Sequence, residues 1–334
     1  MLEVYKQYDG PLYIIPAKTG YDPKLIRELS RDSTMPQNPL YYAAHLPLYP
    51  IFIKLFSFFF GYLKAMILVN VVSTLLLVWM LYFILKRLQI TKHPLLLSTL
   101  FLFLPRFIIV RSTGAPESLF ILCIIISLFF FERKQYAISS LAGFFAVITK
   151  TPGILLFVAY AMTFLEKYIK TKKFEKSQLW ILLIPSGLVA VFSLYSFQYG
   201  DFFAFFHTGG VVPMPFPFAV FNTGAKWVGT AWLEDVLFYF FLYGLTVYQL
   251  KDSKYRSFFY FSLLFFTATL FVQHRDISRY SLPLWPMACI AFEGFFSSKK
   301  FIIIFLIMIF GIYMYAWNFL AYNVMPINEW LPFL

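Results

Sequence analysis

The chain alternates between long apolar runs and short polar loops along most of its length. From residue 64 onward, apolar runs recur at about the length that a helix needs to cross a bilayer, roughly 17–25 residues. They predict helices at about 64–86, 94–111, 116–131, 136–150, 153–166, 179–198, 232–250, 257–272, 281–296 and 300–321. Several of these runs are shorter than a full span, which predicts helices that are tilted, broken or sheltered inside the bundle.

The first 60 residues follow a different pattern. Residues 1–46 are polar and proline-containing, and we expect them to form an external loop with short helices. Residues 47–60 are apolar but too short to span, and they carry Lys54, so we expect a helix lying at the membrane interface. The predicted organisation is a single domain over 1–334, with a transmembrane bundle at 64–321 and a second external loop at 200–231.

Composition supports the membrane assignment. The chain is 60% hydrophobic and 13% charged, whereas a soluble domain carries roughly 25% charged residues. We therefore predict an all-α polytopic membrane protein of about ten transmembrane helices. The net charge of +12 does not indicate nucleic-acid binding, because the basic residues are divided among short loops. Cys123 and Cys289 lie inside apolar runs, as buried thiols do, and no metal-binding spacing is present.

The distribution of lysine and arginine predicts the topology. Every second loop is basic, and by the positive-inside rule these loops face the cytoplasm. The N-terminal segment, the loops near residues 105–116 and 150–153, the 200–231 loop and residues 273–280 then face outward. This parity places the N-terminus outside. Either it is translocated without a leading helix, or a first transmembrane helix precedes residue 1, and we favour the second account.

Charged and histidine side chains from five distant segments would gather on the outer face. They are Asp9, Asp22, His45, Arg106, Arg111, Glu117, Lys150, His207, His274, Arg275, Asp276 and Arg279. Charge near membrane depth is costly and usually functional. Cations facing a carboxylate suit a phosphate-binding site in which the carboxylate takes a proton from an attacking hydroxyl.

Structural alternatives stay open for most of these residues. Asp276 and Arg279 can form an internal ion pair in a solvated loop, or Arg275 and Arg279 can share one face of a helical turn as a phosphate clamp. Glu117 follows Pro116 and can cap the first turn of a helix. Lys150 can be a snorkelling lysine at a helix end.

The segment around Asp9 carries a recognisable pattern. It reads Tyr8-Asp9-Gly10-Pro11-Leu12-Tyr13-Ile14-Ile15-Pro16-Ala17-Lys18-Thr19-Gly20-Tyr21. This resembles the W-D-x-x-x-[FY]-x-x-I-A-x-x-G-Y stretch in the first external loop of PIG-V-like mannosyltransferases. That family belongs to the GT-C superfamily of polyprenyl-phosphate-sugar-dependent glycosyltransferases. A lone aspartate near a chain start is usually only solvated, and the resemblance is what indicates a catalytic one.

Five further motifs resemble that family in the same order along nearly the whole chain. They are Leu46-Pro47-Leu48-Tyr49-Pro50, Pro116-Glu117-Ser118-Leu119-Phe120, Thr149-Lys150-Thr151-Pro152-Gly153, Tyr199-Gly200-Asp201-Phe202-Phe203-Ala204-Phe205, and Arg279-Tyr280 followed by Pro283. The chain departs from the family pattern at Tyr8, where tryptophan is usual, and at Lys150, where arginine is usual. Lysine keeps the charge but loses the planar fork. The family's leading transmembrane helix is also absent.

The resemblance implies inverting transfer of a sugar, possibly mannose, from a polyprenyl-phosphate donor to an acceptor hydroxyl. Asp9 would be the general base. Arg279, Arg275, His274 and Lys150 would bind the donor phosphate. The residues expected to bind or orient substrates are Glu117, Tyr13, Tyr21, Asp22, His45, Tyr49 and Tyr280, although interfacial tyrosines are also common as membrane anchors. The acceptor is a lipid, a glycan or a protein. No metal site is predicted, and a divalent cation bridging Asp9 and the phosphate stays open.

Two other classes of function stay open beside the enzyme. A transporter or flippase of lipid-linked sugars would share the apolar groove and basic patch but would not need Asp9 as a base. A non-catalytic membrane subunit would tolerate the loss of both Asp9 and Arg279. The short loops and the lack of a soluble domain favour a multi-pass enzyme in the plasma membrane of a prokaryote, with its active site facing outward and membrane lipids around it.

Overall fold

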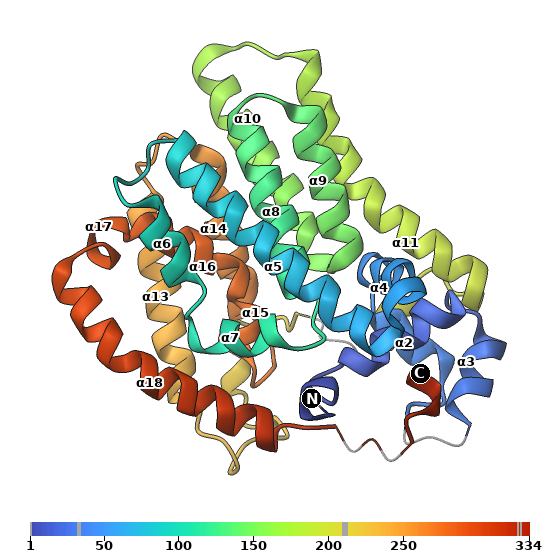
Figure 1. The fold of residues 1–334 in the computed structure, drawn as a ribbon. Coiled ribbons are helices and arrows are strands. Elements are labelled where there is room, and N and C mark those ends of the chain that lie inside the picture. Colours follow the sequence, from blue (N-terminus) through green and yellow to red (C-terminus); the bar gives the residue numbers. More distant parts are fainter. Residues whose placement is uncertain (1, 32–34, 209–212, 326, 328) are drawn as a thin grey trace.

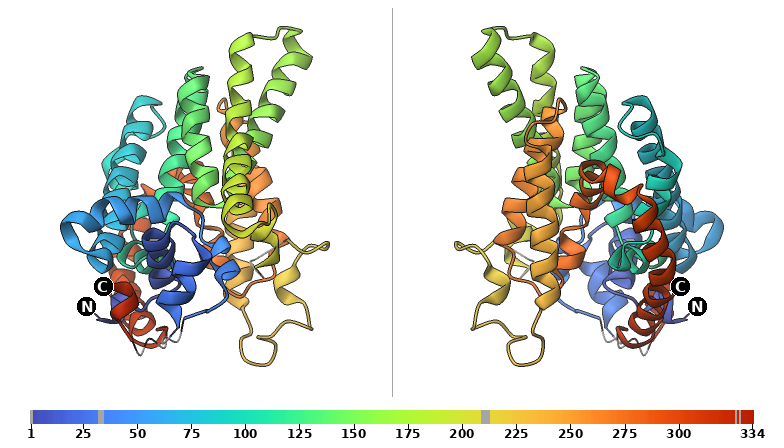
Figure 2. Two further views of the ribbon diagram at one scale, coloured as in Figure 1. Left: turned by 90° about the vertical axis from the view of Figure 1, so that its right-hand side faces the viewer. Right: turned by 90° about the vertical axis from the view of Figure 1, so that its left-hand side faces the viewer.

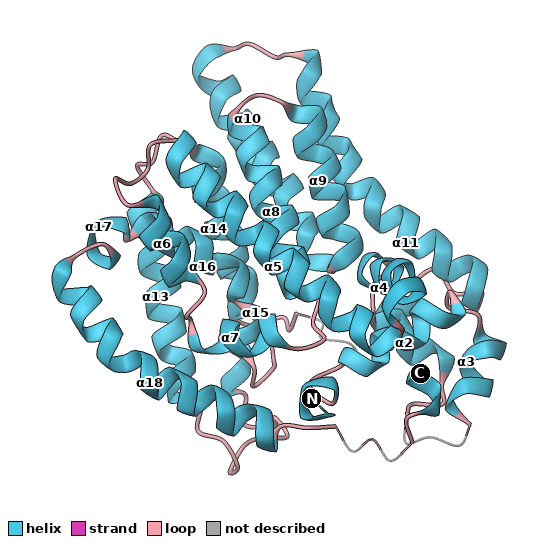
Figure 3. Cartoon of the chain, in the orientation of Figure 1, coloured by secondary structure: helices cyan, strands magenta, loops and turns pink. Residues whose placement is uncertain are grey.

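The structure is a computed structural model that describes residues 2–31, 35–208, 213–325, 327 and 329–334. Within these ranges the regular elements are helices joined by loops, and the one exception is an isolated antiparallel bridge between Gln7 and Val324 (Figure 3). The all-α class predicted from the sequence is therefore confirmed.

The N-terminal segment folds into short helices that dock under the bundle (Figure 1). They are α1 (Leu2–Tyr5), α2 (Gly10–Thr19), α3 (Pro23–Ser30), the 3-10 helix η1 (Pro39–Ala44) and α4 (Leu48–Phe60). Prolines in the first turns of α2 and α3 are pre-set for helix entry, and Gly20 ends α2 with a φ of +60°. Nearly all of α2 is buried, so this helix is an inner part of the fold.

Longer helices build the bundle. They are α5 (Tyr62–Arg87), α6 (Pro94–Phe101), α7 (Pro105–Ser112), α8 (Glu117–Glu132), α9 (Tyr136–Thr149), η2 (Thr151–Ile154), α10 (Leu155–Thr171), η3 (Lys176–Leu182), α11 (Leu183–Tyr199), α13 (Glu234–Leu250), α14 (Arg256–Leu270) and α18 (Lys299–Tyr322). Shorter elements connect them, namely α12 (Ala204–His207), η4 (Ala219–Phe221), α15 (Ile277–Tyr280), η5 (Leu282–Leu284), α16 (Trp285–Ala291), α17 (Glu293–Phe296) and η6 (Leu331–Phe333). Helix α8 packs between α5 and α9, and α10 packs on α14.

Fewer helices than expected are long enough to cross a bilayer. By length and composition, four helical segments among the described residues qualify: α5, η2 with α10, η3 with α11, and α18. The apolar run expected as one helix at 94–111 is instead α6 and α7, bent by 74°. Pro105 explains the break, because the residue before a proline favours extended backbone, and Leu104 has a ψ of 125°. The run expected at 281–296 is likewise divided into η5, α16 and α17.

The loops sort into two ends of the bundle. The basic loops at 88–93, 133–135, 172–175 and 251–255 lie toward one end, at the top of Figure 1, which we call the lysine-rich end. The N-terminal helices and the loops at 113–116 and 271–276 lie toward the other, which we call the site end. The grouping agrees with the loop charges, while the side of the membrane that each end faces stays a prediction.

Candidate functional site

A buried carboxylate lies at the centre of the site end. Glu117 is the first residue of α8, and the residue is only 1% exposed. One of its oxygens, Oε1, accepts hydrogen bonds from Lys150 Nζ and from Arg279 Nε, each at 2.7 Å. Lys150 follows the end of α9, and Arg279 lies in α15, so the fold joins three separate segments. The second oxygen, Oε2, is buried without a hydrogen-bond partner among the described residues. Glu117 therefore ties down two cations and does not serve as a helix cap.

Besides their hydrogen bonds to Glu117, Lys150 and Arg279 each contact an aromatic ring. The Arg279 guanidinium lies 4.1 Å from the centroid of the Tyr8 ring, and Lys150 Nζ lies 5.6 Å from that of Tyr280. Such cation–π contacts strengthen where water is excluded. Within the described part of the chain, the Arg279 Nη atoms donate no hydrogen bond to protein. A partly exposed guanidinium edge and an ammonium group are thus left to receive an anion.

Arg106 forms a neighbouring cluster that motif reasoning did not assign. It bonds Asp276 Oδ1 through Nη2 at 3.0 Å and the Tyr8 hydroxyl through Nη1 at 3.0 Å. Its Nε donates to Ser278 Oγ at 2.9 Å, and its guanidinium lies over the Phe319 ring. Arg106 therefore links α7, the N-terminal segment, the α15 turn and α18. These partners are too distant in sequence for any spacing rule to pair them.

This arrangement corrects the expected Asp276–Arg279 pair. Asp276 binds Arg106, whereas Arg279 binds Glu117, because the single turn of α15 directs the two side chains to different partners. The expected clamp of Arg275 and Arg279 is not formed either. Arg275 is exposed, and no ion pair joins it to another described residue, while Arg279 is largely buried.

Asp9 is the exposed carboxylate of the site. It precedes α2, and its side chain makes no capping hydrogen bond. The preceding residue, Tyr8, has a φ of +49°, a conformation uncommon for a bulky residue. Asp9 lies within electrostatic range of Arg279, His45 and Tyr13. The site thus contains one paired, buried carboxylate and one exposed carboxylate close to the same arginine.

Buried aromatic rings lie close to Asp9. His45 is 4% exposed, and its ring packs edge-to-face on Tyr13, which packs in turn on Tyr49. Burial lowers the pKa of His45 to about 4, with Asp9 opposing and Arg279 assisting this shift. The Tyr49 hydroxyl donates to Met66 O, and the Tyr21 hydroxyl donates to His45 O. Tyr21 and Tyr49 have no exposed face for a sugar, so their placement favours a structural role.

Two other expected site residues have local partners. The Asp22 side chain accepts from the amides of Lys24 and Leu25, so it caps α3. His274 Nδ1 accepts from the Asp276 amide at 3.0 Å, and its ring packs on Tyr280 at 4.8 Å. Burial lowers the pKa of His274. A neutral ring with Nδ1 as acceptor carries its proton on Nε2, which is then a hydrogen-bond donor.

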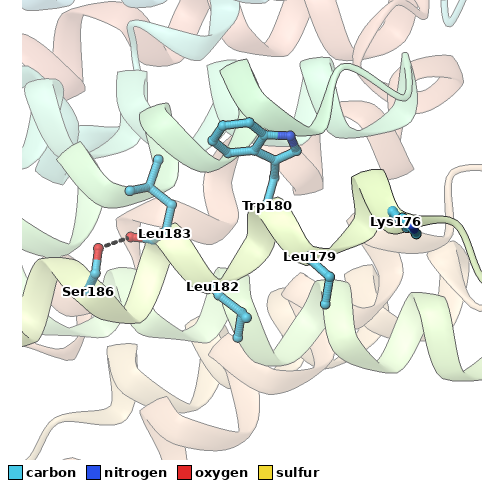
Figure 4. A pocket seen from close by; sticks show the side chains of 6 residues that line it. All are labelled: Lys176, Leu179, Trp180, Leu182, Leu183 and Ser186. Carbon is cyan, nitrogen blue, oxygen red and sulfur yellow. Dashed lines mark hydrogen bonds between the residues drawn. The ribbon is translucent and has the colours of Figure 1, made fainter.

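An open apolar hollow lies away from this cluster. An open apolar depression of about 500 Å³ lies along η3 and the start of α11 (Figure 4). Its lining residues are Lys176, Leu179, Trp180, Leu182, Leu183 and Ser186. It contains no carboxylate or histidine, so we place the chemistry at the Glu117 cluster. Across the described residues, no group of three or more His, Cys, Asp or Glu is suited to hold a metal ion.

Comparison with known proteins gives a relationship at the level of structure. No family model matches the chain, and no curated protein matches it by sequence. The crystal structure of ArnT from Cupriavidus metallidurans, bound to undecaprenyl phosphate, matches with a TM-score of 0.61 at 12% identity. The match covers 89% of this chain and 58% of that one. The chain therefore shares its fold with that structure over most of its own length. With its long apolar helices, this fold makes it an integral membrane protein.

Proposed function

We propose that the chain is a GT-C-type glycosyltransferase that moves a sugar from a polyprenyl-phosphate donor to an acceptor hydroxyl at the site end. The observation that carries the proposal is the exposed Asp9 within electrostatic range of Arg279, a cation that buried Glu117 holds in place together with Lys150. The fold shared with ArnT, which was crystallised with undecaprenyl phosphate, supports a lipid-phosphate donor. The motif resemblance favours mannose. The loop charges favour an outward-facing active site, and the short loops favour the plasma membrane of a prokaryote.

The proposed reaction is a single displacement. The acceptor oxygen attacks the anomeric carbon while the bond from that carbon to the phosphate oxygen breaks, and the configuration inverts. Asp9 takes the hydroxyl proton, because an exposed carboxylate with no ion-pair partner among the described residues can reach a bound substrate. The leaving polyprenyl phosphate carries both electrons of the broken bond.

Charge balance fits this assignment. Lys150, Arg279 and Glu117 together carry a net charge of +1, which matches the single negative charge of a phosphodiester donor. The phosphate gains a second negative charge as the bond breaks, and the two cations stabilise it. Glu117 acts as a positioning residue, because its Oε1 holds both cations before the reaction starts. His274 can add a hydrogen bond to the phosphate from Nε2.

The decisive experiment measures sugar transfer by the purified protein in nanodiscs from a panel of radiolabelled polyprenyl-phosphate sugars. We compare wild type with Asp9→Asn, which keeps the shape but removes the base. We expect a loss of roughly 10²–10⁴-fold, the usual contribution of a general base. Glu28→Gln is the matched control, since Glu28 is an exposed carboxylate on α3 at the same end, and it should keep wild-type activity.

Two results would overturn the proposal. An Asp9→Asn protein with wild-type turnover would remove the assigned base. Wild-type protein that binds the lipid-linked sugar without turning it over, across the whole panel, would indicate a transporter, a flippase or an accessory subunit. The sugar that is released names the donor, which tests the expectation of mannose.

A further inference from the structure

The segment from residue 202 to the start of α13 is unusually apolar for a stretch with little regular structure. Between residues 202 and 233, the only ionisable side chains are His207 and Lys226. The described part of this loop exposes large apolar side chains, namely Phe202, Phe203, Phe206, Phe216, Phe218, Phe221, Val228 and Trp232. Trp232 is 78% exposed. Contiguous exposed apolar surface of this kind marks contact with a partner or a membrane.

The loop is held firmly in this exposed arrangement. Trp227 Nε1 donates to Val220 O at 3.0 Å, and Val220 packs with Val236 and Ile277 in a small core. Phe218 and Leu233 have φ values of +57° and +58°, which non-glycine residues rarely adopt. Such strain persists only where the surrounding structure enforces it. The apolar side chains therefore face outward because the fold places them there.

The position of the loop indicates which partner it meets. In the two side views of Figure 2, the loop reaches the same end of the molecule as the C-terminal part of α18. Only 6% of the most apolar 18-residue window of α18 is buried, as expected of a helix that faces lipid. Its C-terminal part exposes Tyr313, Tyr315, Trp317 and Tyr322. Tyrosine and tryptophan gather in this way where a helix leaves the hydrocarbon.

We propose that the aromatic loop, residues 202–208 and 213–232, inserts its exposed side chains into the phospholipid interface at the site end. The shared level of the loop and the exposed aromatic end of α18 supports lipid as the occupant. A protein partner would call for a polar rim around the patch, and this loop has almost no charge to supply one. Phe and Trp side chains facing an interface bind lipid in this manner.

The loop also borders the candidate site. The Trp227 ring lies 6.4 Å from the His274 ring, which packs on Tyr280. A lipid-seated loop would therefore place one wall of the site at the membrane surface. The insertion itself does not rest on the proposed function, because it concerns contact with lipid and not turnover.

Depth-dependent fluorescence quenching tests the insertion. Val228→Cys and Trp232→Cys are each labelled with an environment-sensitive fluorophore and placed in phosphatidylcholine nanodiscs with spin-labelled acyl chains. Ile307→Cys on α18 is the lipid-facing reference, and Glu28→Cys on α3 is the water-facing control. The native Cys123 and Cys289 are buried, and unmodified protein carried through the same labelling measures their background.

We expect the spin-labelled lipid to lower the fluorescence emission of the probes at 228 and 232 severalfold. This quenching should approach that of the reference probe at 307, whereas the emission of the probe at 28 should change little. Iodide in the water should quench the probe at 28 most strongly. Probes at 228 and 232 that behave like the probe at 28 would overturn the proposal, as would shielding from both quenchers, which would indicate a protein partner. Since four surface positions report separately, a single variant that fails to fold does not hide the answer.

Discussion

The two ends of the bundle use charge in opposite ways. At the site end, Glu117 and Arg279 pair across 162 positions of sequence with side chains only 2% and 12% exposed. At the lysine-rich end, Glu166 pairs with Lys170 four residues away, and the Lys170 side chain is 68% exposed. Arg256 joins the same carboxylate from α14. The site-end network is buried and long-range, whereas the Glu166 network combines a local pair with a long-range one and is partly exposed.

The difference shows which network needs a functional explanation. Exposed ion pairs within one helix cost little desolvation energy and contribute little stability. Such pairs are therefore expected at helix ends next to loops whose lysines set the topology. A buried ion pair loses much of its Coulomb energy to desolvation, and apolar side chains would often stabilise the same site as well. Glu117 and its two cations are therefore expected to contribute little net stability to the fold. The proposed binding of a phosphate accounts for this buried cluster better.

The largest effect should come from neutralising Glu117. Glu117→Gln leaves the largely buried Arg279 and the half-buried Lys150 without their counter-charge, and we expect it to destabilise the fold by about 3–5 kcal/mol. The matched change at the other end, Glu166→Gln, should cost about 1 kcal/mol or less. Unfolding in mixed micelles, followed by circular dichroism, measures both. Equal losses of unfolding free energy for the two variants would show that the two ion-pair networks contribute equally to stability.

A second effect should appear on acidification. The pKa of His45 is lowered to about 4 in the fold, below the ordinary 6.5, so the unfolded chain takes up this proton first. Its contribution to stability is present above pH 6.5 and is lost as the pH falls toward 4, by about 3 kcal/mol at 1.36 kcal/mol per pKa unit. The pKa of the half-buried His274 is lowered in the same direction.

His45→Gln isolates that contribution. The variant lacks the titrating ring, so its melting temperature should fall less than that of wild type between pH 6.5 and pH 4. Thermal melts at several pH values in one detergent provide the comparison. Parallel curves for the two proteins would mean that His45 does not carry the acid sensitivity of the site end.

The smallest effect should come from the local pair at the lysine-rich end. Lys170→Ala removes the i,i+4 partner of Glu166, and we expect a change of about 0.5 kcal/mol or less. Raising the salt concentration should reduce even this difference, since exposed charges are screened. A loss as large as that of Glu117→Gln would contradict the contrast between the two ends.

The sequence by itself determined the all-α membrane class of the protein. It also determined which segments lie together at the site end and how the charges divide between the two ends of the bundle. Apolar runs of fixed length and the alternation of basic loops follow from burial and from bilayer thickness, which act locally, so they can be read from the chain. Glu117, Lys150 and Arg279 could be selected from their places in the outward-facing segments, whereas the motif around Asp9 was selected by its resemblance to a known family. The roles assigned to them stay predictions.

Only the tertiary structure decided the pairings. Glu117 binds Lys150 and Arg279, Asp276 binds Arg106, and Asp22 caps α3, where spacing alone had suggested other partners or a substrate. The bend between α6 and α7 and the exposed aromatic loop before α13 are likewise products of the assembled bundle. The physical reason is common to these cases. A side chain takes the partner with the lowest free energy among those that the fold brings within a few ångströms, and the sequence order does not record that set.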